Sequence, residues 1–292
     1  MKNSEGRSQR CGSAQRRVVF YVFGLVGFLA IPTQAQLIVA HRGASHTAPE
    51  NTAAAFELAW QEKADAIEAD FRLSRDGQIV CIHDATTQRT AGVDRIVAQS
   101  TLAELKALDV GSWKHPQYKG QRVLTLAEVL EMVPRGKKIF VELKTGPEIV
   151  KPLKDVVTAS RISSGQILVI TFNEETAREV KRVIPNLKVH WLTGYEDTDR
   201  TSGGRGGINR ITDSLSRTHA DGLGSEANRE IFNDSFIRKL TENGLQEFHV
   251  WTVDNANDAN YYQRLGAFSI TTNRPGFIRK KLKLDQPQKQ DD

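Results

Sequence analysis

The chain has 292 residues, with 40 Lys and Arg against 35 Asp and Glu and a pI of about 9.2. Five of the basic residues and one acidic residue lie in the first 35 positions, so the rest of the chain holds 35 basic and 34 acidic residues. Bulk charge therefore gives no reason to expect nucleic acid or a membrane surface as the partner. The remaining ~255 residues are ample for a hydrophobic core.

The N-terminal segment has the pattern of a secretory signal peptide. Arg16 and Arg17 precede the 14-residue apolar run Val18–Ile31, and Thr33-Gln34-Ala35 supplies small residues for a cleavage site. We expect cleavage after Ala35 and a mature protein in the periplasm or outside the cell. A permanent membrane anchor is the alternative, but the run is shorter than the ~20 residues that span a bilayer.

The two cysteines give little chemistry. Cys11 lies within the predicted signal peptide, so Cys81 would be the one cysteine of the mature chain, and no intramolecular disulfide is available. Cys81 stands in the apolar run Ile79–Ile82, which favours a small buried hydrophobic residue over a catalytic thiol.

After residue 35 the chain alternates strand-like and helix-like segments. Most strand candidates are short apolar runs, which is typical of parallel strands buried on both faces. We expect strands at Leu37–Ala40, Ala66–Leu73, Lys138–Leu143, Gln166–Thr171, Leu187–Leu192, Gly222–Gly224, Phe248–Val253 and Ala267–Thr271, and helices at Thr52–Glu62, Leu126–Met132, Glu148–Ala159, Glu174–Ile184, Ile208–Arg217, Asn233–Glu242 and Asn255–Leu265. Thr101 and Thr125 each begin a capping-box pattern.

Eight strands with intervening helices predict an α/β fold, a (β/α)8 TIM-type barrel over residues 36–285. A doubly wound open sheet is the alternative. Residues 79–124 form an insertion between the second and third barrel strands, beginning as a hairpin whose turn is Arg75–Gln78. Thr201–Gly207 is rich in glycine and reads as a loop rather than a phosphate cradle, because its spacing fits no nucleotide motif. The tail 286–292 is polar and is expected to be disordered.

Four polar clusters follow apolar runs: His41-Arg42-Gly43, Glu68-Ala69-Asp70, His83-Asp84 and Glu142-Leu143-Lys144. In a barrel, the carboxyl ends of the strands carry the active site. Two imidazoles for proton transfer, three carboxylates for a hard cation and two basic groups for an anion are the parts needed for metal-assisted cleavage of a phosphate ester.

The three carboxylates are the candidate metal ligands. Glu68 and Asp70 are two residues apart on a strand, so their side chains lie on one face, and Glu142 on the next barrel strand completes the site. Oxygen ligands favour Mg²⁺ or Ca²⁺, with Mn²⁺ also suitable. The alternative is that one carboxylate faces a helix and pairs with Arg72 or Arg75.

His41 and His83 are the candidate proton-transfer residues, since a near-neutral imidazole can take a proton from a nucleophile or give one to a leaving group. Arg42 could bind a phosphate bidentately, and Lys144 could neutralise phosphoryl charge. A salt bridge from Lys144 to Glu142 is the alternative. Trp251 could form a wall of the pocket or pack in the core.

The residues also resemble a known family, the glycerophosphodiester phosphodiesterases. The resemblance covers nearly all of the mature chain and rests on highly specific motifs. The matching stretches are His41-Arg42-Gly43 with Pro49–Thr52, Glu68-Ala69-Asp70 with Leu73–Gly77, His83-Asp84, Leu124–Glu128, Val141–Lys144 and Val250–Asp254.

The resemblance implies a metal-dependent hydrolase that splits a glycerophosphodiester into glycerol 3-phosphate and an alcohol, by attack of water or of the neighbouring glycerol hydroxyl. It implies that Glu50 and Asn51 help to hold the first loop. The remaining implied roles are acid and base for His41 and His83, cation binding for Glu68, Asp70 and Glu142, phosphate binding for Arg42 and Lys144, and substrate contact for Trp251.

The chain departs from the family pattern at Asn273, where the family usually has Asp before Arg-Pro. Asn keeps the size and the ability to cap a helix but lacks the charge. Two competing functions remain: a phospholipase D-like lyase that acts on intact lipid, and a catalytically silent binding module. The sequence leaves open the head group, the cation and the oligomeric state.

Overall fold

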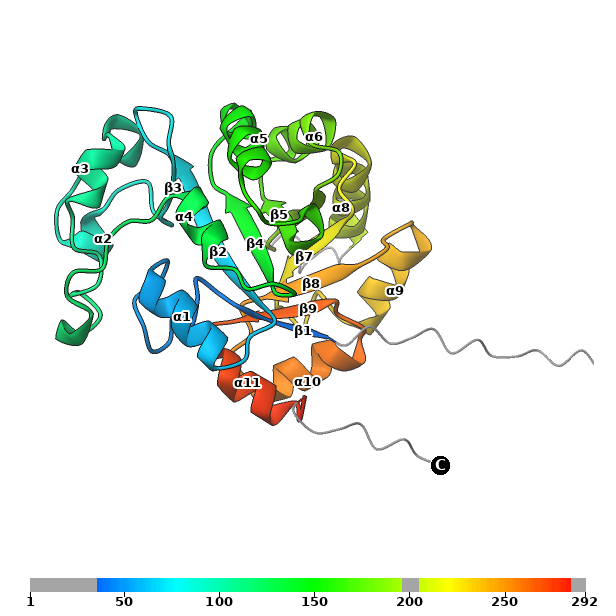
Figure 1. The fold of residues 1–292 in the computed structure, drawn as a ribbon. Helices are drawn as coiled ribbons and strands as arrows, with labels where there is room; N and C mark the ends of the chain where they lie inside the picture. Colours follow the sequence, from blue (N-terminus) through cyan, green and yellow to red (C-terminus); the bar gives the residue numbers. More distant parts are fainter. Residues whose placement is uncertain (1–35, 196–204, 285–292) are drawn as a thin grey trace, which may run out of the picture. The chain divides into compact units, whose positions relative to one another are not determined.

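The computed structural model describes residues 36–195 and 205–284. Eight of its strands are parallel and close into a barrel (Figure 1). They are β1 (Leu37–Ala40), β2 (Ala66–Leu73), β4 (Lys138–Leu143), β5 (Ile167–Thr171), β6 (Lys188–Thr193), β7 (Gly222–Glu226), β8 (Phe248–Trp251) and β9 (Ser269–Thr272). Because β1 pairs with both β2 and β9, the eight parallel strands form a closed ring, and the barrel is the correct fold rather than the open doubly wound sheet.

All the predicted strands are present, with ends within two residues of those expected, and the predicted helices agree within three residues. The helices surround the barrel and bury apolar faces against it: Ala177 and Val180 on one, Phe236 and Leu240 on another. They are α1 (Ala53–Gln61), α4 (Leu126–Glu131), α5 (Val150–Ala159), α6 (Glu174–Val183), α8 (Arg205–Thr218), α9 (Asp234–Glu242), α10 (Ala256–Arg264) and α11 (Pro275–Lys281).

The insertion between β2 and β4 begins with the predicted hairpin. Strand β3 (Ile79–Cys81) pairs antiparallel to β2, and Ser74 N donates to Gln78 O at 2.9 Å across the turn. The short helices α2 (Gln88–Ala91) and α3 (Leu102–Lys106) follow and lie beyond the hairpin in Figure 1. The chain thus turns back after β3 and carries His83 toward the end of β2, where Ile82 N donates to Asp70 O at 2.9 Å.

Two histidines fill part of the barrel interior, and two glycines leave room for them. A Cβ on Gly222 would lie 2.6 Å from His190 Nε2, and one on Gly224 would lie 2.4 Å from His249 Cε1. The two rings stack with centroids 5.1 Å apart, and both residues are buried. Strand β7 therefore needs glycine at both inward positions.

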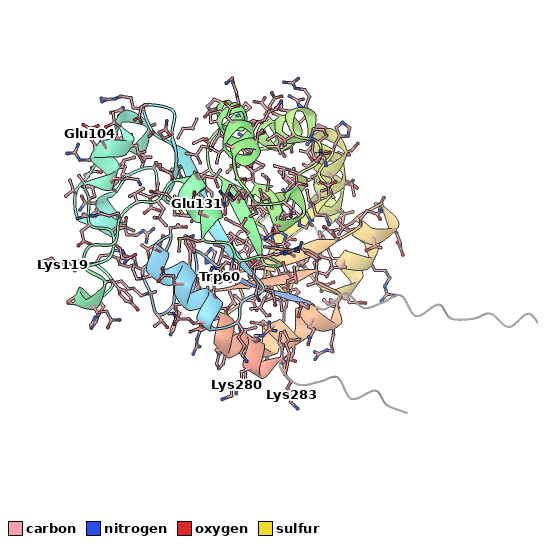
Figure 2. All side chains as sticks on the ribbon, viewed as in Figure 1. Trp60, Glu104, Lys119, Glu131, Lys280 and Lys283 are labelled. Carbon is pink, nitrogen blue, oxygen red and sulfur yellow. The ribbon has the colours of Figure 1, made fainter. Side chains whose placement is uncertain are left out.

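The basic C-terminal stretch Arg279–Lys283 begins in α11, which the sequence patterns did not predict. Lys280 and Lys283 are exposed, and Figure 2 shows their side chains pointing outward from this helix. Within the described ranges, none of the helices has the length and apolar character needed to cross a bilayer.

Several expectations concern residues outside the described ranges: the signal peptide 1–35 with its cleavage site after Ala35, and the tail 286–292. Most of the glycine-rich stretch Thr201–Gly207 also lies outside them. Its last three residues, however, begin α8 at Arg205, so the helix starts three residues earlier than the pattern indicated.

Candidate active site

The three predicted carboxylates meet at the mouth of the barrel. Glu68 and Asp70 lie on β2, and Glu142 lies on β4, in register with Asp70. One oxygen from each lies within 4.8 Å of the others, and all three residues are buried. Glu68 Oε1 and Asp70 Oδ1 accept no hydrogen bond, which is unusual for buried carboxylate oxygens. We call these three residues the carboxylate cluster.

Burial and crowding strongly disfavour three negative charges here. Burial, then the neighbouring Asp70 and Glu142, raises the pKa of Glu68 well above its usual value. Burial and Asp70 likewise raise the pKa of Glu142 to about 7. For Asp70, burial acts in the same direction, but Arg42 and Lys144 outweigh it and lower the pKa. The cluster thus has more acid than its neighbouring bases neutralise, which is the arrangement that a divalent cation fits.

Arg42 and Lys144 are the two bases of this cluster. Arg42 Nε lies 3.1 Å from Asp70 Oδ2, while Lys144 Nζ lies 2.7 Å from Glu142 Oε1 and 3.3 Å from Asp70 Oδ1. The salt bridge considered as the alternative for Lys144 is therefore present. The alternative pairing of Glu68 or Asp70 with Arg72 or Arg75 is not seen. Arg72 Nε donates to His83 O at 2.8 Å, and Arg75 pairs with Glu104 instead.

The turn after β1 holds Arg42 against the cluster. Arg42 has φ +55°, and its backbone N–H donates to Glu68 Oε2 at 2.8 Å. Gly43 follows with φ +80°, and a Cβ there would lie 2.6 Å from Ala55 of α1. Only glycine fits this position, because the turn packs directly on the helix.

Glu50 and Asn51 connect the first loop to the rest of the site, as the resemblance implied. Glu50 binds Arg42 Nη1 at 3.0 Å and also both terminal nitrogens of Arg89 in the insertion. Asn51 Nδ2 donates to Asp70 Oδ2 at 2.8 Å. The first loop, β2 and the insertion are thereby joined around the carboxylate cluster.

His41 lies at the end of β1 with its two ring nitrogens in different surroundings. Nδ1 is 2.7 Å from Asn273 Oδ1, and Nε2 is 4.0 Å from Glu68 Oε2. Burial, followed by the charge of Arg42, lowers the pKa of His41 to about 4. The ring is therefore neutral over most of the physiological range.

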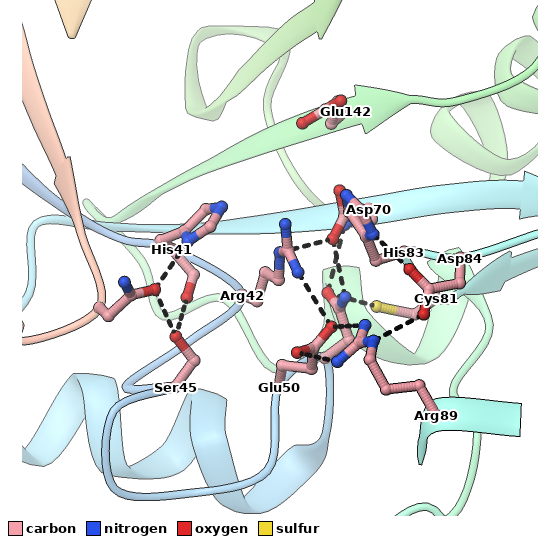
Figure 3. Close-up of polar contacts among 12 residues, drawn as sticks. His41, Arg42, Ser45, Glu50, Asp70, Cys81, His83, Asp84, Arg89 and Glu142 are labelled. Atoms are coloured by element: carbon pink, nitrogen blue, oxygen red, sulfur yellow. Dashed lines mark hydrogen bonds and ion pairs between the residues drawn. The ribbon is translucent and has the colours of Figure 1, made fainter. Parts of the chain in front are cut away.

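His83 approaches the same mouth from the insertion. Its Nδ1 lies 2.7 Å from Asp84 Oδ1, and Asp84 Oδ2 accepts from Arg89 Nε at 2.7 Å. Hydrogen bonds from Arg89 and His83 outweigh partial burial and lower the pKa of Asp84 to about 2. In the view of Figure 3, His41 and His83 stand on either side of Arg42.

A cavity of about 210 Å³ brings the predicted residues together, with the exception of Asp70, which is fully buried and does not line it. One side is polar and the other apolar, where Trp251 and Phe172 meet edge to face with ring centroids 5.5 Å apart. Trp251 therefore lines the cavity as well as packing on the interior. The lining residues are His41, Arg42, Glu68, His83, Glu142, Lys144, Ile170, Phe172, Leu192, His249, Trp251, Thr252 and Thr271.

Sequence reasoning gave no site role to Phe172, Asn273 or Asp254, although it noted Asn273 as a departure from the family pattern. Phe172 directly follows β5, and Asn273 directly follows β9, so their position at strand ends was a usable signal. Asn273 was considered as a helix cap, but α11 begins after Arg274 without a side-chain cap, and the Asn273 side chain instead contacts His41. His190 and His249 bond each other through Nδ1 at 2.8 Å.

The chain matches the model of the glycerophosphoryl diester phosphodiesterase family over residues 41–277. It is 30% identical to a glycerophosphodiester phosphodiesterase of Bacillus subtilis, over 88% of this chain and 94% of that one. It is 33% identical to one from Caldanaerobacter subterraneus, over 82% and 94%. A solved Oleispira antarctica phosphodiesterase, in complex with the product sn-glycerol-3-phosphate, superposes with a TM-score of 0.75 at 25% identity, covering 85% of this chain and 96% of that one.

Proposed function

The chain belongs to the glycerophosphoryl diester phosphodiesterase family, and from this premise we propose that it releases glycerol 3-phosphate and an alcohol by cation-dependent hydrolysis. Its class, a phosphoric diester hydrolase, follows from the family itself. The observation that supports the finer proposal is one cavity holding both His41 and His83 beside an acidic cluster in which two buried oxygens accept no hydrogen bond.

The carboxylate cluster would hold the cation. Glu68, Asp70 and Glu142 offer only oxygen ligands, and two of their buried oxygens have no hydrogen-bond donor, so the residues fit Mg²⁺, Ca²⁺ or Mn²⁺. A bound cation supplies positive charge that stabilises a phosphoryl oxygen and the developing charge on it. Removing a proton from Glu142 is part of binding, because its pKa is raised to about 7.

His41 and His83 would move the protons. His41 is largely buried and neutral, whereas His83 sits beside the ionised Asp84, so the two imidazoles have different partners in one cavity. One takes a proton from the attacking oxygen and the other returns a proton to the leaving alkoxide.

Arg42 and Lys144 would orient the phosphate, and the apolar wall would contact the organic part of the substrate. Both basic side chains line the cavity while contacting Asp70, so they place positive charge next to the cluster. Trp251 and Phe172 form a face suited to the carbon atoms of the glycerol or head group.

A coupled assay for glycerol 3-phosphate tests the proposal. Purified mature protein is treated with chelator and given glycerophosphocholine or glycerophosphoethanolamine, with Mg²⁺, Ca²⁺ or Mn²⁺ added back. We expect release of glycerol 3-phosphate that requires one of these cations. We expect no release from the Glu68→Gln variant, whose thermal stability should equal or exceed that of the wild type.

Absence of release with every cation, from protein shown by circular dichroism to be folded, would contradict the hydrolase proposal. Two controls then separate the competitors. Production of a cyclic phosphate from lysophospholipid vesicles would indicate the lyase, to which the 47% exposed Phe172 beside the cavity could offer an apolar contact. Binding of glycerophosphocholine without turnover would indicate a silent module.

We also propose that the protein is exported and cleaved after Ala35, leaving no stable membrane anchor. The support is the basic, apolar and small-residue pattern of residues 1–35. Expression with the native leader should yield a mature N-terminus at Gln36 by intact mass, and Ala35→Arg should block that cleavage. A full-length product in the wild-type strain would contradict the proposal.

A further inference from the structure

The Asn273 side chain joins His41 to Asp254, a carboxylate that is not part of the carboxylate cluster. Asn273 Oδ1 lies 2.7 Å from His41 Nδ1, and Asn273 Nδ2 donates to Asp254 Oδ2 at 2.6 Å. The Ser45 hydroxyl is also within hydrogen-bond distance of Asn273 Oδ1, at 2.8 Å. These contacts form a continuous line from Asp254 through the amide to the His41 ring.

Asp254 determines which way the amide points. Its Oδ1 accepts from the backbone N–H of Asn273 and from Thr272 Oγ1, both at 2.8 Å, and its Oδ2 accepts from Asn273 Nδ2. An ionised carboxylate only accepts, so the amide must turn its NH2 group toward Asp254. The amide oxygen is then the atom that faces His41, and a flipped amide would place oxygen against oxygen.

The amide in turn determines the tautomer of His41. A carbonyl oxygen only accepts hydrogen bonds, so the proton in the contact with Asn273 must belong to His41 Nδ1. In the neutral ring, Nε2 then carries the lone pair. Nε2 is the nitrogen on the side of Glu68, 4.0 Å from its Oε2, and His41 lines the cavity.

We propose that Asn273 and Asp254 are a positioning pair that holds His41 as its Nδ1–H tautomer, with the unprotonated Nε2 directed at the cavity. The consequence for turnover rests on the proposed function, whereas the tautomer does not. An amide performs this task without adding another negative charge beside the acid-rich carboxylate cluster.

The backbone of Asn273 already supplies the structural link between the last strand and the first loop. Its carbonyl accepts from His46 N at 3.0 Å, and the carbonyl of Thr272 accepts from His41 N at 2.8 Å. Changing the side chain leaves these main-chain bonds available. The Asn273 side chain adds the contact with the Ser45 hydroxyl of the first loop, so melting temperature must be read beside the tautomer and kcat to separate loop holding from orientation of His41.

Two isosteric substitutions, Asn273→Asp and Asp254→Asn, together exchange which residue of the pair carries the amide and which carries the carboxylate. In Asn273→Asp, two carboxylates would face each other where Nδ2 and Oδ2 now lie 2.6 Å apart. In Asp254→Asn, the acceptor that orients the Asn273 amide is lost. In the double variant, Asn at 254 keeps Oδ1 for its two present donors and gives Nδ2–H to Asp at 273, which still accepts from His41 Nδ1.

The first measurement is ¹⁵N NMR of the imidazole nitrogens in metal-free full-length mature protein at pH 7.5, with the His41 signals assigned from His41→Gln. We expect the Nδ1–H tautomer in the wild type and in the double variant, and a mixture of tautomers in Asp254→Asn. Because no substrate is present, this readout stands even if glycerophosphodiester hydrolysis is not observed. A wild-type His41 protonated on Nε2 would overturn the proposal.

The second measurement is steady-state kinetics with the substrate and cation found in the release assay. Each single variant should lose about tenfold or more in kcat with KM little changed, because a misoriented proton acceptor acts on the chemical step. The double variant should recover to within about threefold of wild type. Asn257→Asp, the same substitution at an exposed position of α10, is the control and should leave kcat unchanged.

Two results would contradict the proposal that Asn273 and Asp254 position His41. One is a double variant as impaired as the worse single variant while its melting temperature matches the wild type. The other is unchanged kcat and an unchanged tautomer in both single variants. Recovery of melting temperature without recovery of kcat would show that the two side chains stabilise the loop but do not orient His41.

Discussion

At the barrel mouth, the buried Glu68 Oε1 has no hydrogen-bond donor and Asp70 Oδ1 has only its ion pair with Lys144 at 3.3 Å, whereas the buried His190 and His249 bond each other, and His190 Nε2 also contacts Glu247 at 2.6 Å. Both groups are polar and inaccessible to solvent. The first leaves acceptors open and carries excess charge, while the histidines are neutral and their contacts lie within the protein. We call His190 and His249 the histidine pair.

This difference separates a binding site from a structural feature. An unpaired buried acceptor costs stability unless a ligand satisfies it, so the carboxylate cluster is expected to be stabilised by something it binds. In the histidine pair, three of the four ring nitrogens have protein partners, through the Nδ1–Nδ1 contact and the contact of His190 Nε2 with Glu247. Changes at the mouth should therefore act mainly on activity, and changes at the histidine pair mainly on stability.

The largest effect is expected from Glu68→Gln. It should lower cation affinity and reduce activity by more than the ~10²-fold expected for loss of one proton-transfer group. The metal-free protein should at the same time become more stable, since one of three crowded carboxylates is neutral. Melting curves in chelator and with added cation, together with the release assay, check both. A lower melting temperature in chelator would show that the cluster is structural.

Next in size are His41→Ala and His83→Ala. Each should cut turnover by ~10²-fold or more while folding and cation binding stay near wild type, because proton transfer affects only the chemical step. Cation binding by calorimetry is the control. Wild-type turnover in either variant would remove that residue from the proton-transfer assignment.

Gly224→Ala tests the space that the histidine pair occupies. Its Cβ would lie 2.3 Å from Leu192 Cδ2 and 2.4 Å from His249 Cε1, so overpacking should cost about 1–3 kcal/mol of unfolding free energy. Gly165→Ala is the matched control, because nothing lies within 4 Å of its added Cβ. Urea unfolding of both variants measures the difference. If Gly224→Ala were as stable as Gly165→Ala, the barrel interior would relax around the added methyl group without cost.

The smallest expected effect is on the pH dependence of stability. Burial, then the neighbouring His190, lowers the pKa of His249 well below its usual 6.5. The unfolded chain therefore binds a proton near pH 6.5 that the folded protein does not, so this stability is present above pH 6.5 and is lost as the pH falls below it.

His249→Gln cannot titrate, so its unfolding free energy should fall less between pH 7 and pH 5 than that of the wild type. Urea titrations at the two pH values give the comparison. An identical fall in both proteins would assign the acid sensitivity to other groups, of which His190 is the nearest, since burial lowers its pKa also.

Much of the fold could be predicted because parallel strands buried on both faces appear as short apolar runs, and Leu37–Ala40 is an example. The short elements could not: α2 has four residues and α11 has seven, beginning at Pro275 with two residues between it and the end of β9, so neither shows a helical period. The glycines of β7 gave a weak strand pattern for a reason visible only in three dimensions, namely the rings opposite them.

At the site, the three carboxylates were found because they lie on neighbouring barrel strands, and the two histidines because each follows a strand-like run. Their contacts were less predictable. Asp70 is shared by Arg42 and Lys144. Asn273 contacts His41 although 232 positions separate them in the sequence. Both contacts depend on side-chain directions, which sequence spacing does not encode.

Closure of the barrel between its first and last strands has a further consequence for folding. His41 acquires its partners only when β1 pairs with β9, which joins residues about as distant in sequence as the described chain contains. Contacts of such separation are slow to form because a long loop must be closed first. Completion of the site therefore depends on the last strand, because His41 lacks its contact with Asn273 until β9 pairs with β1.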